Sequence, residues 1–236
     1  MNLRTPAEFQ PSMAICTPMR MIPTPHGKRM EPITMEWHRA MKALLMPTGY
    51  NVGEIRVDGK EIGEARCIAV EEAQRRNFKY LVFIDADTIP PPNGMRLLIY
   101  QLDNNPDYDV AGGLYTMKGH PSVPLVWDRW GEGVFWDWTL GDVLKQNIVA
   151  CGTGFMAIRM SLFDRISNTP ENPWFLTDFG TCDQQGNEQF QYMVSDDIHF
   201  CKRISEVGAK ILVDTNVYCR HIDANAIQWQ LPDDSL

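Results

Sequence analysis

The sequence predicts an α/β protein in which a mainly parallel central sheet is flanked by helices. Apolar segments of strand length alternate with segments of helical periodicity between residues 13 and 102. Residues Tyr80–Ile84 are apolar without a break, as expected of a strand that is buried on both faces of a covered sheet. The composition, with 44% hydrophobic and 22% charged residues, is that of a globular protein with a substantial core.

The first half of the chain is expected to alternate strands with helices. The elements follow in this order: a strand at 13–18, a helix that starts at 32 and is ended by 47–49, a strand at 50–57, a helix at 61–73, a strand at 80–84 and a helix at 95–102. Each of the three helices places apolar residues at helical spacing on one face. This order is typical of a doubly wound sheet with right-handed crossovers.

The second half has a less regular pattern. Val110–Tyr115 is predicted to be a strand whose glycines allow another backbone to come close. Ser161, with Asp164 three residues later, predicts the N-cap of a short helix. Residues 167–194 are rich in Asn, Gly, Gln and Pro and predict a long loop, a kind of segment that often serves as a lid. A last strand is expected at Ile211–Val213.

The charge and the apolar segments limit the classes of function and location. A formal net charge of −8 argues against a broad basic surface for nucleic acid. No apolar run is long enough to cross a bilayer, and the N-terminal segment lacks the pattern of a signal peptide. The six cysteines include no C-x-x-C pair and are expected to be reduced core residues. We therefore expect a cytoplasmic protein without a membrane span.

Two carboxylates, Asp85 and Asp87, directly follow the central strand and precede three consecutive prolines. Because proline ends a strand, both acids are expected at its carboxyl end, where open α/β sheets bind ligands. Alternation along the strand would turn both side chains the same way. Like charges at a buried strand end are costly unless a cation lies near them. The motif predicts a metal or nucleotide site, and the alternative is a solvated turn.

A second acidic motif, Ser195-Asp196-Asp197, opens a helix that is expected to end at Gly208. Ser195 is predicted to be the cap, with both carboxylates in the first turn, where the helix dipole keeps acids ionised. The alternative is that these acids only stabilise the helix. His221 follows the last predicted strand, and by itself a single histidine is more often a surface or core residue than a ligand.

Residues 121–140 contain four of the seven tryptophans of the chain, namely Trp127, Trp130, Trp136 and Trp138. Two interpretations of this aromatic segment stay open. One is a stacking platform for a sugar or a base, and the other is a satellite core under a long loop.

In this order, the motifs resemble those of glycosyltransferases of the GT-A fold, in the style of the family 2 group, over residues 12–222. The features that carry the resemblance are Glu64-Ala65-Arg66, Asp85-Ala86-Asp87, Gly152-Thr153-Gly154-Phe155-Met156, Asp196-Asp197 and His221. The resemblance implies a single Rossmann-like GT-A catalytic domain over residues 1–236. Its nucleotide-sugar-binding half would span roughly 12–105 and its acceptor-binding half roughly 106–225.

The resemblance also implies a donor and a cofactor. The donor would be a nucleotide diphosphate sugar, with a UDP-sugar expected, and Asp87 and His221 would bind a Mn²⁺ or Mg²⁺ ion at its diphosphate. A mixed carboxylate and imidazole ligand set favours Mn²⁺. The other nucleotide-binding positions implied are Asp85 and Ala86 at the ribose, Arg66 near the base or phosphates, and Thr17 and Pro18 at the base or ribose.

For the acceptor, the resemblance assigns Asp197 as the general base that removes a proton from the attacking hydroxyl. Asp196 would orient the acceptor or the donor sugar. Gly152-Thr153-Gly154 would line the acceptor side, because missing side chains allow close approach. Attack from the far face would invert the anomeric carbon. Four acceptor classes stay open: a glycan, a protein side chain, a lipid-linked sugar and a modified nucleobase.

The chain departs from the family pattern in two places. Asp196-Asp197 stands where Glu-Asp is common, and Thr17-Pro18-Met19-Arg20 stands where many members have a Tyr-Asn pair, which bears on base recognition. Two alternative functions remain: a nucleotidyltransferase of similar fold, and a non-catalytic nucleotide- or carbohydrate-binding module. A nucleotidyltransferase usually has a glycine-rich basic loop after its first strand, whereas residues 17–28 contain one glycine. A module would not need both metal-ligand positions and a candidate base.

Overall fold

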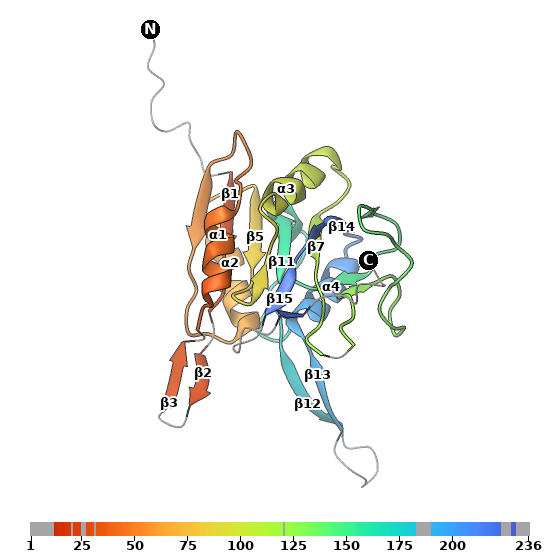
Figure 1. The fold of residues 1–236 in the computed structure, drawn as a ribbon. Coiled ribbons are helices and arrows are strands. Elements are labelled where there is room, and N and C mark those ends of the chain that lie inside the picture. The colour runs from red at the N-terminus through yellow and green to blue at the C-terminus, as the bar shows by residue number, and fades with distance from the viewer. Residues whose placement is uncertain are drawn as a thin grey trace.

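The computed structural model of the chain describes residues 12–19, 21–24, 27–30, 32–119, 121–182, 190–222 and 228–229 (Figure 1). The helices are α1 (Met35–Ala43), α2 (Ile62–Arg75), α3 (Gly94–Asn104), α4 (Asp196–Ser205) and the 3₁₀ helix η2 (Met160–Asp164). The strands are β1 (Met13–Cys16), β2 (Met21–Thr24), β3 (Gly27–Met30), β4 (Val52–Ile55), β5 (Tyr80–Ile84), β6 (Thr88–Ile89), β7 (Val110–Leu114), β8 (Val126–Trp127), β9 (Val143–Leu144), β10 (Ala150–Cys151), β11 (Phe155–Arg159), β12 (Asp178–Cys182), β13 (Phe190–Val194), β14 (Ile211–Tyr218), β15 (Arg220–Ile222) and β16 (Gln228–Trp229).

Among the described residues, seven strands form the central sheet in the order β4-β1-β5-β11-β7-β14-β9. The pairs β1/β4, β1/β5 and β7/β14 are parallel, whereas β11 and β9 run against their neighbours. Five of these seven strands therefore point the same way, which confirms the predicted α/β class with a mainly parallel sheet. The antiparallel β11, inserted between β5 and β7, was not predicted.

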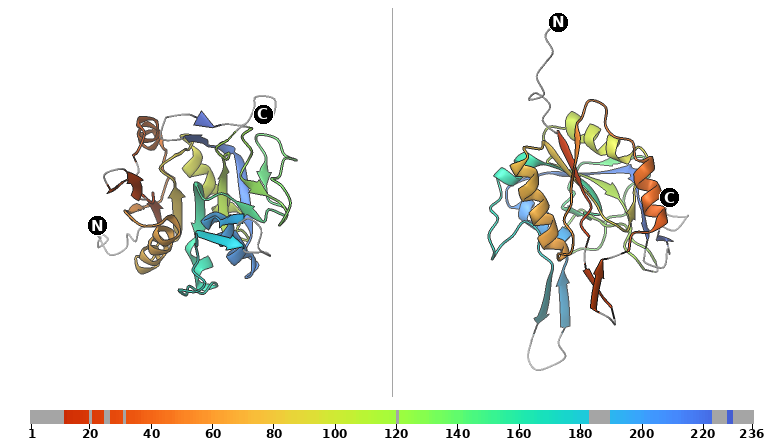
Figure 2. Two further views of the ribbon diagram at one scale, coloured as in Figure 1. Left: turned by 90° about the horizontal axis from the view of Figure 1, so that it is seen from below. Right: turned by 90° about the vertical axis from the view of Figure 1, so that its left-hand side faces the viewer.

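Helices cover both faces of the sheet, with α1 and α2 on opposite sides (Figure 2). Strand β5 shows why, because all five of its residues are buried. Leu81 and Phe83 pack in one cluster with residues of α2 and α4. Tyr80, Val82 and Ile84 pack in another cluster with residues of α3. An uninterrupted apolar strand thus supplies two cores through the two faces of its pleat.

Two hairpins extend from the body of the molecule on the same side (Figure 1). One is β2–β3, and the other is β12–β13, which leads into α4. The long loop predicted at 167–194 is therefore wrong where β12 and β13 form, and its residues 183–189 lie outside the described part of the chain. The hairpin contacts come from backbone pairing, which a composition rich in Asn, Gly and Gln does not reveal.

Two predicted helix ends differ from the structure. Ser161 lies inside η2 and does not cap it, because the N-cap position belongs to Arg159. Ser195 does occupy the N-cap of α4, yet its hydroxyl donates to the Asp197 carboxylate and makes no cap hydrogen bond to the backbone. Helix α4 ends at Ser205, before the predicted Gly208.

The tryptophan segment divides into two parts. Trp127 and Trp138 are partly buried and pack against the core. Trp130 and Trp136 are 42% and 45% exposed, respectively. The satellite-core interpretation therefore describes only the first pair.

Five of the six cysteines, namely Cys16, Cys67, Cys151, Cys201 and Cys219, are free and buried, as expected of reduced core residues. None of the helices in the described part of the chain combines the length and the apolar character needed to cross a bilayer.

Candidate active site

A cavity of about 200 Å³ lies where strands β1 and β5 end. Its lining residues are Pro18, Ile62, Arg66, Asp85, Ala86, Asp87, Tyr115, Thr153, Ser195, Asp196 and Asp197. Eight of the twelve predicted site residues are in this set, although they come from segments more than 100 residues apart. The cavity lies at the carboxyl end of a central strand, where open α/β sheets bind ligands.

Arg66 connects three of the elements that surround the cavity. This residue lies in the second turn of α2 and is only 2% exposed. Its two terminal nitrogens, Nη1 and Nη2, donate to Asp85 Oδ1 over 3.1 and 3.0 Å. Its Nε donates to Asp196 Oδ2 over 2.5 Å, at the start of α4. The guanidinium fork therefore ties the end of β5 to α2 and α4 with charge-assisted hydrogen bonds.

These contacts determine the charge state of the cluster. Burial lowers the pKa of Arg66, but Asp196 and Asp85 outweigh it and hold the pKa well above its ordinary value. Burial raises the pKa of Asp85, and the Arg66 guanidinium opposes that rise. A buried arginine with two carboxylate partners is a positioning group, because most of its donors are already used.

The backbone turns directly after β5, which separates the two acids of the Asp85-Ala86-Asp87 motif. Strand β5 ends at Ile84, and the Thr88 N–H donates to the Asp85 carbonyl over 3.1 Å. The same carbonyl accepts from Trp37 Nε1 over 2.8 Å. The strand alternation that would have turned both carboxylates the same way therefore stops before Asp85. Both acids line the cavity, but with different partners.

Asp87 is bound by two groups at one oxygen. Lys118 Nζ lies 2.6 Å from Asp87 Oδ2, and His221 Nε2 lies 3.3 Å from the same atom. His221 Nδ1 lies 2.8 Å from the Thr116 carbonyl oxygen, which can only accept, so Nδ1 carries a hydrogen. Burial raises the pKa of Asp87, but His221 and Lys118 outweigh this effect and hold it well below its usual range.

This arrangement suits a cation between Asp87 and His221. His221 Nε2 can donate a proton to the Asp87 carboxylate oxygen. Without that proton, Nε2 and the oxygen are two acceptors that a metal ion would have to join. Within the described residues, no group of three or more His, Cys, Asp or Glu side chains is placed to hold a metal. The pair therefore fits a divalent ion that takes its other ligands from water and, once a donor is bound, from the diphosphate.

Asp197 lies in the first turn of α4 and also lines the cavity. Its Oδ1 accepts from the Ser195 hydroxyl and, over 2.8 Å, from the Ile198 N–H. Burial raises the pKa of this carboxyl, and the neighbouring Asp196 raises it further. This direction is opposite to that expected from the helix dipole alone. A raised pKa suits a carboxylate that accepts a proton during a reaction.

Tyr115 fills the space that Gly152 and Gly154 leave. The Tyr115 hydroxyl accepts from the Gly154 N–H over 3.0 Å. A Cβ atom on Gly154 would lie 2.7 Å from Thr88 Oγ1 and 2.8 Å from the Tyr115 ring, and one on Gly152 would meet the same ring. The ring also packs edge-on against His221, with centroids 5.4 Å apart. These glycines therefore leave room for Tyr115, which supports the imidazole.

One predicted residue lies outside the cavity: Thr17 lines a separate pocket of about 330 Å³ that also includes Trp37 of α1. Two residues of the site, Lys118 and Tyr115, were not predicted. No sequence pattern marks Lys118, whereas Tyr115 directly follows a strand, as Asp85 does.

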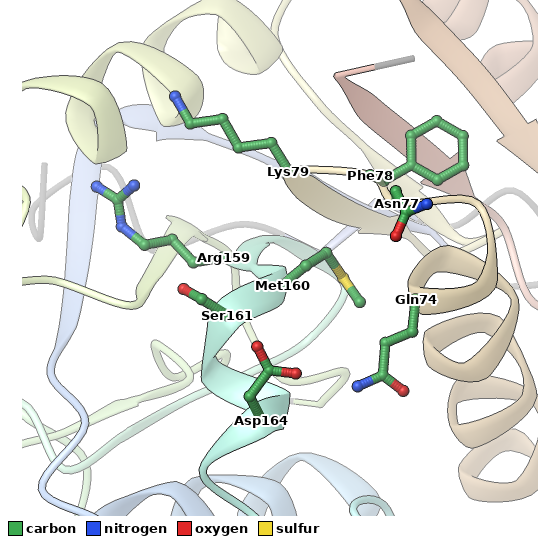
Figure 3. Close-up of a pocket in the computed structure, with 8 residues that line it drawn as sticks. All are labelled: Gln74, Asn77, Phe78, Lys79, Arg159, Met160, Ser161 and Asp164. Carbon is green, nitrogen blue, oxygen red and sulfur yellow. The ribbon is translucent and has the colours of Figure 1, made fainter. Parts of the chain in front are cut away.

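A second cavity, of about 420 Å³, lies at the opposite end of β5 (Figure 3). The two cations on its wall, Lys79 and Arg159, point away from it toward α3. Lys79 binds Asp103 over 3.0 Å, and Arg159 donates to the Tyr80 hydroxyl over 3.0 Å. Because both cations have other partners, this cavity lacks the grouped acids and bases of the first one.

No family model matches the sequence, and no curated protein matches it by sequence. Among solved structures, A197 from STIV is similar with a TM-score of 0.58 and 15% identity over 94% of each chain. TarS 1-349 of S. aureus in complex with UDP-GlcNAc has a TM-score of 0.50 and 12% identity, over 94% of this chain and 58% of that one. GalNAc-T7 with UDP, GalNAc and Mn²⁺ has a TM-score of 0.50 and 14% identity, over 92% of this chain and 44% of that one.

TarS and GalNAc-T7 are glycosyltransferases of the GT-A fold. At these identities the similarity is one of fold, and this chain has the GT-A fold. It spans about the whole length of A197 but less than two thirds of TarS and less than half of GalNAc-T7.

Proposed function

We propose that the protein is a metal-dependent glycosyltransferase that moves a sugar from a nucleotide diphosphate sugar, expected to be a UDP-sugar, to an acceptor hydroxyl. The GT-A fold supports this proposal, as do two similar structures that contain UDP-GlcNAc or UDP with Mn²⁺. The observation that carries it is the Asp87–His221 pair, in which a carboxylate oxygen and an imidazole nitrogen face each other across 3.3 Å.

On the donor side, Asp87 and His221 would hold the divalent ion, with Mn²⁺ favoured over Mg²⁺. The bound ion would neutralise charge that develops on the departing diphosphate. Asp85 is held by Arg66 on the cavity wall, beside Ala86, where we place the ribose of the donor. Pro18 lines the same wall. Arg66 keeps Asp85 and Asp196 in position and has few donors left for a nucleotide.

On the acceptor side, Asp197 would take the proton of the attacking hydroxyl. Within the described residues, both hydrogen bonds to this carboxylate go to Oδ1, which leaves Oδ2 for the acceptor. Asp196 is fixed by Arg66 and would orient the sugars next to Thr153. With Asp197 as the base and the metal at Asp87, attack from the far face of the donor sugar would invert the anomeric carbon.

The test is the release of UDP from UDP-sugars in the presence of Mn²⁺, together with the affinity for UDP. We expect Asp87→Ala and His221→Ala to lower Mn²⁺-dependent UDP affinity by at least about tenfold, because each removes a metal ligand. Asp103→Ala is the matched control, since Asp103 also binds a lysine but lies on α3, away from the cavity. Unchanged affinity in both Asp87→Ala and His221→Ala would reject the proposed metal site.

The same assay tests the base. Asp197→Asn should keep UDP affinity and lose transfer by roughly 10²- to 10⁴-fold, the usual contribution of a general base. An equal loss of UDP affinity would mean that Asp197 binds the donor. Metal-dependent nucleotide binding by the unmodified protein without turnover on any acceptor would instead support a non-catalytic module.

A further inference from the structure

Lys118 is a charged residue of the site that neither the sequence motifs nor the fold assigns. It follows β7 in a loop whose two sides are joined by backbone hydrogen bonds. The Met117 N–H donates to the Val123 carbonyl over 2.9 Å, and the Leu125 N–H donates to the Tyr115 carbonyl over 2.9 Å. The loop thus holds the backbone of Lys118 beside the site.

The same loop positions both partners of Asp87. Its Thr116 carbonyl orients His221 through Nδ1, and its Lys118 side chain binds Asp87 Oδ2 over 2.6 Å. Because His221 Nε2 faces this oxygen as well, the ammonium group lies where a metal bound to Asp87 would have to be accommodated. If a metal ion bound Asp87 Oδ2 at about 2.1 Å while the Lys118 ammonium kept its hydrogen bond to the same oxygen, the two positive charges would repel each other.

The charges of the cavity explain why the diphosphate of the donor would bind the displaced Lys118 ammonium. Asp85, Asp87, Asp196 and Asp197 place four carboxylates on the cavity wall, and Arg66 is the one cation among the lining residues that the structure describes. A diphosphate is an anion and would be repelled by this wall. It therefore needs positive charge beyond that of Arg66, most of whose donors are used by Asp85 and Asp196.

Lys118 can supply that charge because its side chain can move. It is 33% exposed, whereas the Arg66 side chain is 2% exposed. An ammonium on a flexible four-carbon stem has no fixed hydrogen-bond geometry, unlike a guanidinium fork. We propose that Lys118 is an exchanging cation: it neutralises Asp87 in the empty site, yields this carboxylate to the divalent metal, and then binds the diphosphate of the donor. This inference rests on the proposed function.

Two dissociation constants test the exchange in the full chain: that of Mn²⁺ without nucleotide, followed by the EPR signal of free Mn²⁺, and that of UDP at saturating Mn²⁺, measured by calorimetry. In Lys118→Gln we expect Mn²⁺ to bind roughly ten- to a hundredfold more tightly, because no ammonium has to be displaced. UDP should bind about tenfold more weakly, because one cation is lost. Lys118→Arg should keep the UDP affinity within about threefold, since the charge remains.

Lys60→Gln is the matched control, because Lys60 binds Glu64 over the same 2.6 Å on the surface of α2 and should change neither constant. If Lys118→Gln changes neither constant while Asp87→Ala abolishes Mn²⁺ binding, the metal site stands and the exchange is wrong. If UDP binding by the unmodified protein persists in EDTA and is lost in Lys118→Gln, Lys118 replaces the metal and the exchange is again wrong. Absence of Mn²⁺ binding in both the unmodified protein and Lys118→Gln would reject the proposed metal site itself.

Discussion

Asp85 and Asp87 are separated by one residue, yet their carboxylates are held in different ways. Asp85 is bound by the fork of Arg66, which is 2% exposed and also binds Asp196. Asp87 is bound by Lys118, which is 33% exposed, and is faced by His221. The partner of Asp85 cannot move away without leaving buried charges unpaired. The partners of Asp87 can change.

Within one short motif, Asp85 stabilises the fold around the cavity, whereas Asp87 would be free to bind a ligand. The Arg66 pairings join β5, α2 and α4, so they hold the walls of the cavity together. The Lys118 pairing joins Asp87 only to a loop. Asp197 is a third case, because among the described residues its carboxylate is bound by a hydroxyl and an N–H and by no cation. Substitutions can test each of these three environments.

The largest effect is expected from Arg66→Met. Methionine fills much of the space of the buried stem but leaves Asp85 and Asp196 without their counter-charge. Breaking a buried ion pair from one side costs about 3–5 kcal/mol, and we expect a loss of this size in the free energy of unfolding, measured by urea denaturation.

Arg75→Met provides the control on the same helix, because the Arg75–Glu72 pair is exposed and should not change the urea midpoint measurably. Lys118→Gln should also leave the midpoint nearly unchanged. If Arg66→Met unfolds at the midpoint of the unmodified protein, the cluster is not part of the architecture, and the contrast between Asp85 and Asp87 disappears.

A smaller effect on the free energy of unfolding is expected from Gly154→Ala. Gly154 contacts Asp85 directly and His221 through Tyr115. The Gly154 carbonyl accepts the Asp85 N–H over 2.9 Å, and its own N–H donates to Tyr115, which packs against His221. The new methyl group would meet Thr88 Oγ1 at 2.7 Å. Overpacking of this kind costs about 1–3 kcal/mol in the free energy of unfolding, to be measured by thermal or urea unfolding.

Displacement of Tyr115 should also weaken Mn²⁺ binding, because the ring no longer supports His221. Gly133→Ala is the control, since nothing lies within 4 Å of a Cβ at that position. A stable Gly154→Ala variant with unchanged Mn²⁺ affinity would show that Tyr115 does not link the two sides.

The parts of the site that the sequence could predict are those with a local pattern. Tyr80–Ile84 is buried on both faces because it is apolar throughout, and its end places Asp85 and Asp87 at the sheet edge. Ser195 takes the N-cap position because a polar residue precedes two acids and an apolar stripe. Periodicity and caps depend on neighbours in sequence, so a single chain reveals them.

The parts that could not be predicted depend on contacts between distant segments. Lys118 lies 31 residues from Asp87 in the chain, and its loop is closed by backbone bonds that no side-chain pattern marks. Strand β11 enters the sheet against the direction of both neighbours, which strand and helix alternation does not predict. The glycines of Gly152-Thr153-Gly154 were predicted to face a sugar, but the space beside them holds Tyr115.

The smallest effect is expected from Ser195→Ala, which tests the carboxylate that has no cation. Asp197 must be ionised to accept a proton, so kcat/KM should rise with pH as this group loses its own proton. Burial and Asp196 raise the pKa of Asp197, whereas the Ser195 hydroxyl lowers it by stabilising the charged form. Removing the hydroxyl therefore raises the pKa further and moves the acid limb of the pH profile to higher pH.

On that limb the variant should lose roughly two- to tenfold in kcat/KM, the size of one hydrogen bond, and well above it the two proteins should be equal. Ser205→Ala at the other end of α4 is the control, because the Ser205 hydroxyl donates to the Lys202 carbonyl of its own helix. A limb that stays in place, or that moves to lower pH, would mean that Asp197 is not the group whose ionisation limits transfer. A limb that moves as expected would distinguish Asp197 from Asp85 and Asp87, whose charges are set by Arg66, Lys118 and the metal and should not respond to Ser195.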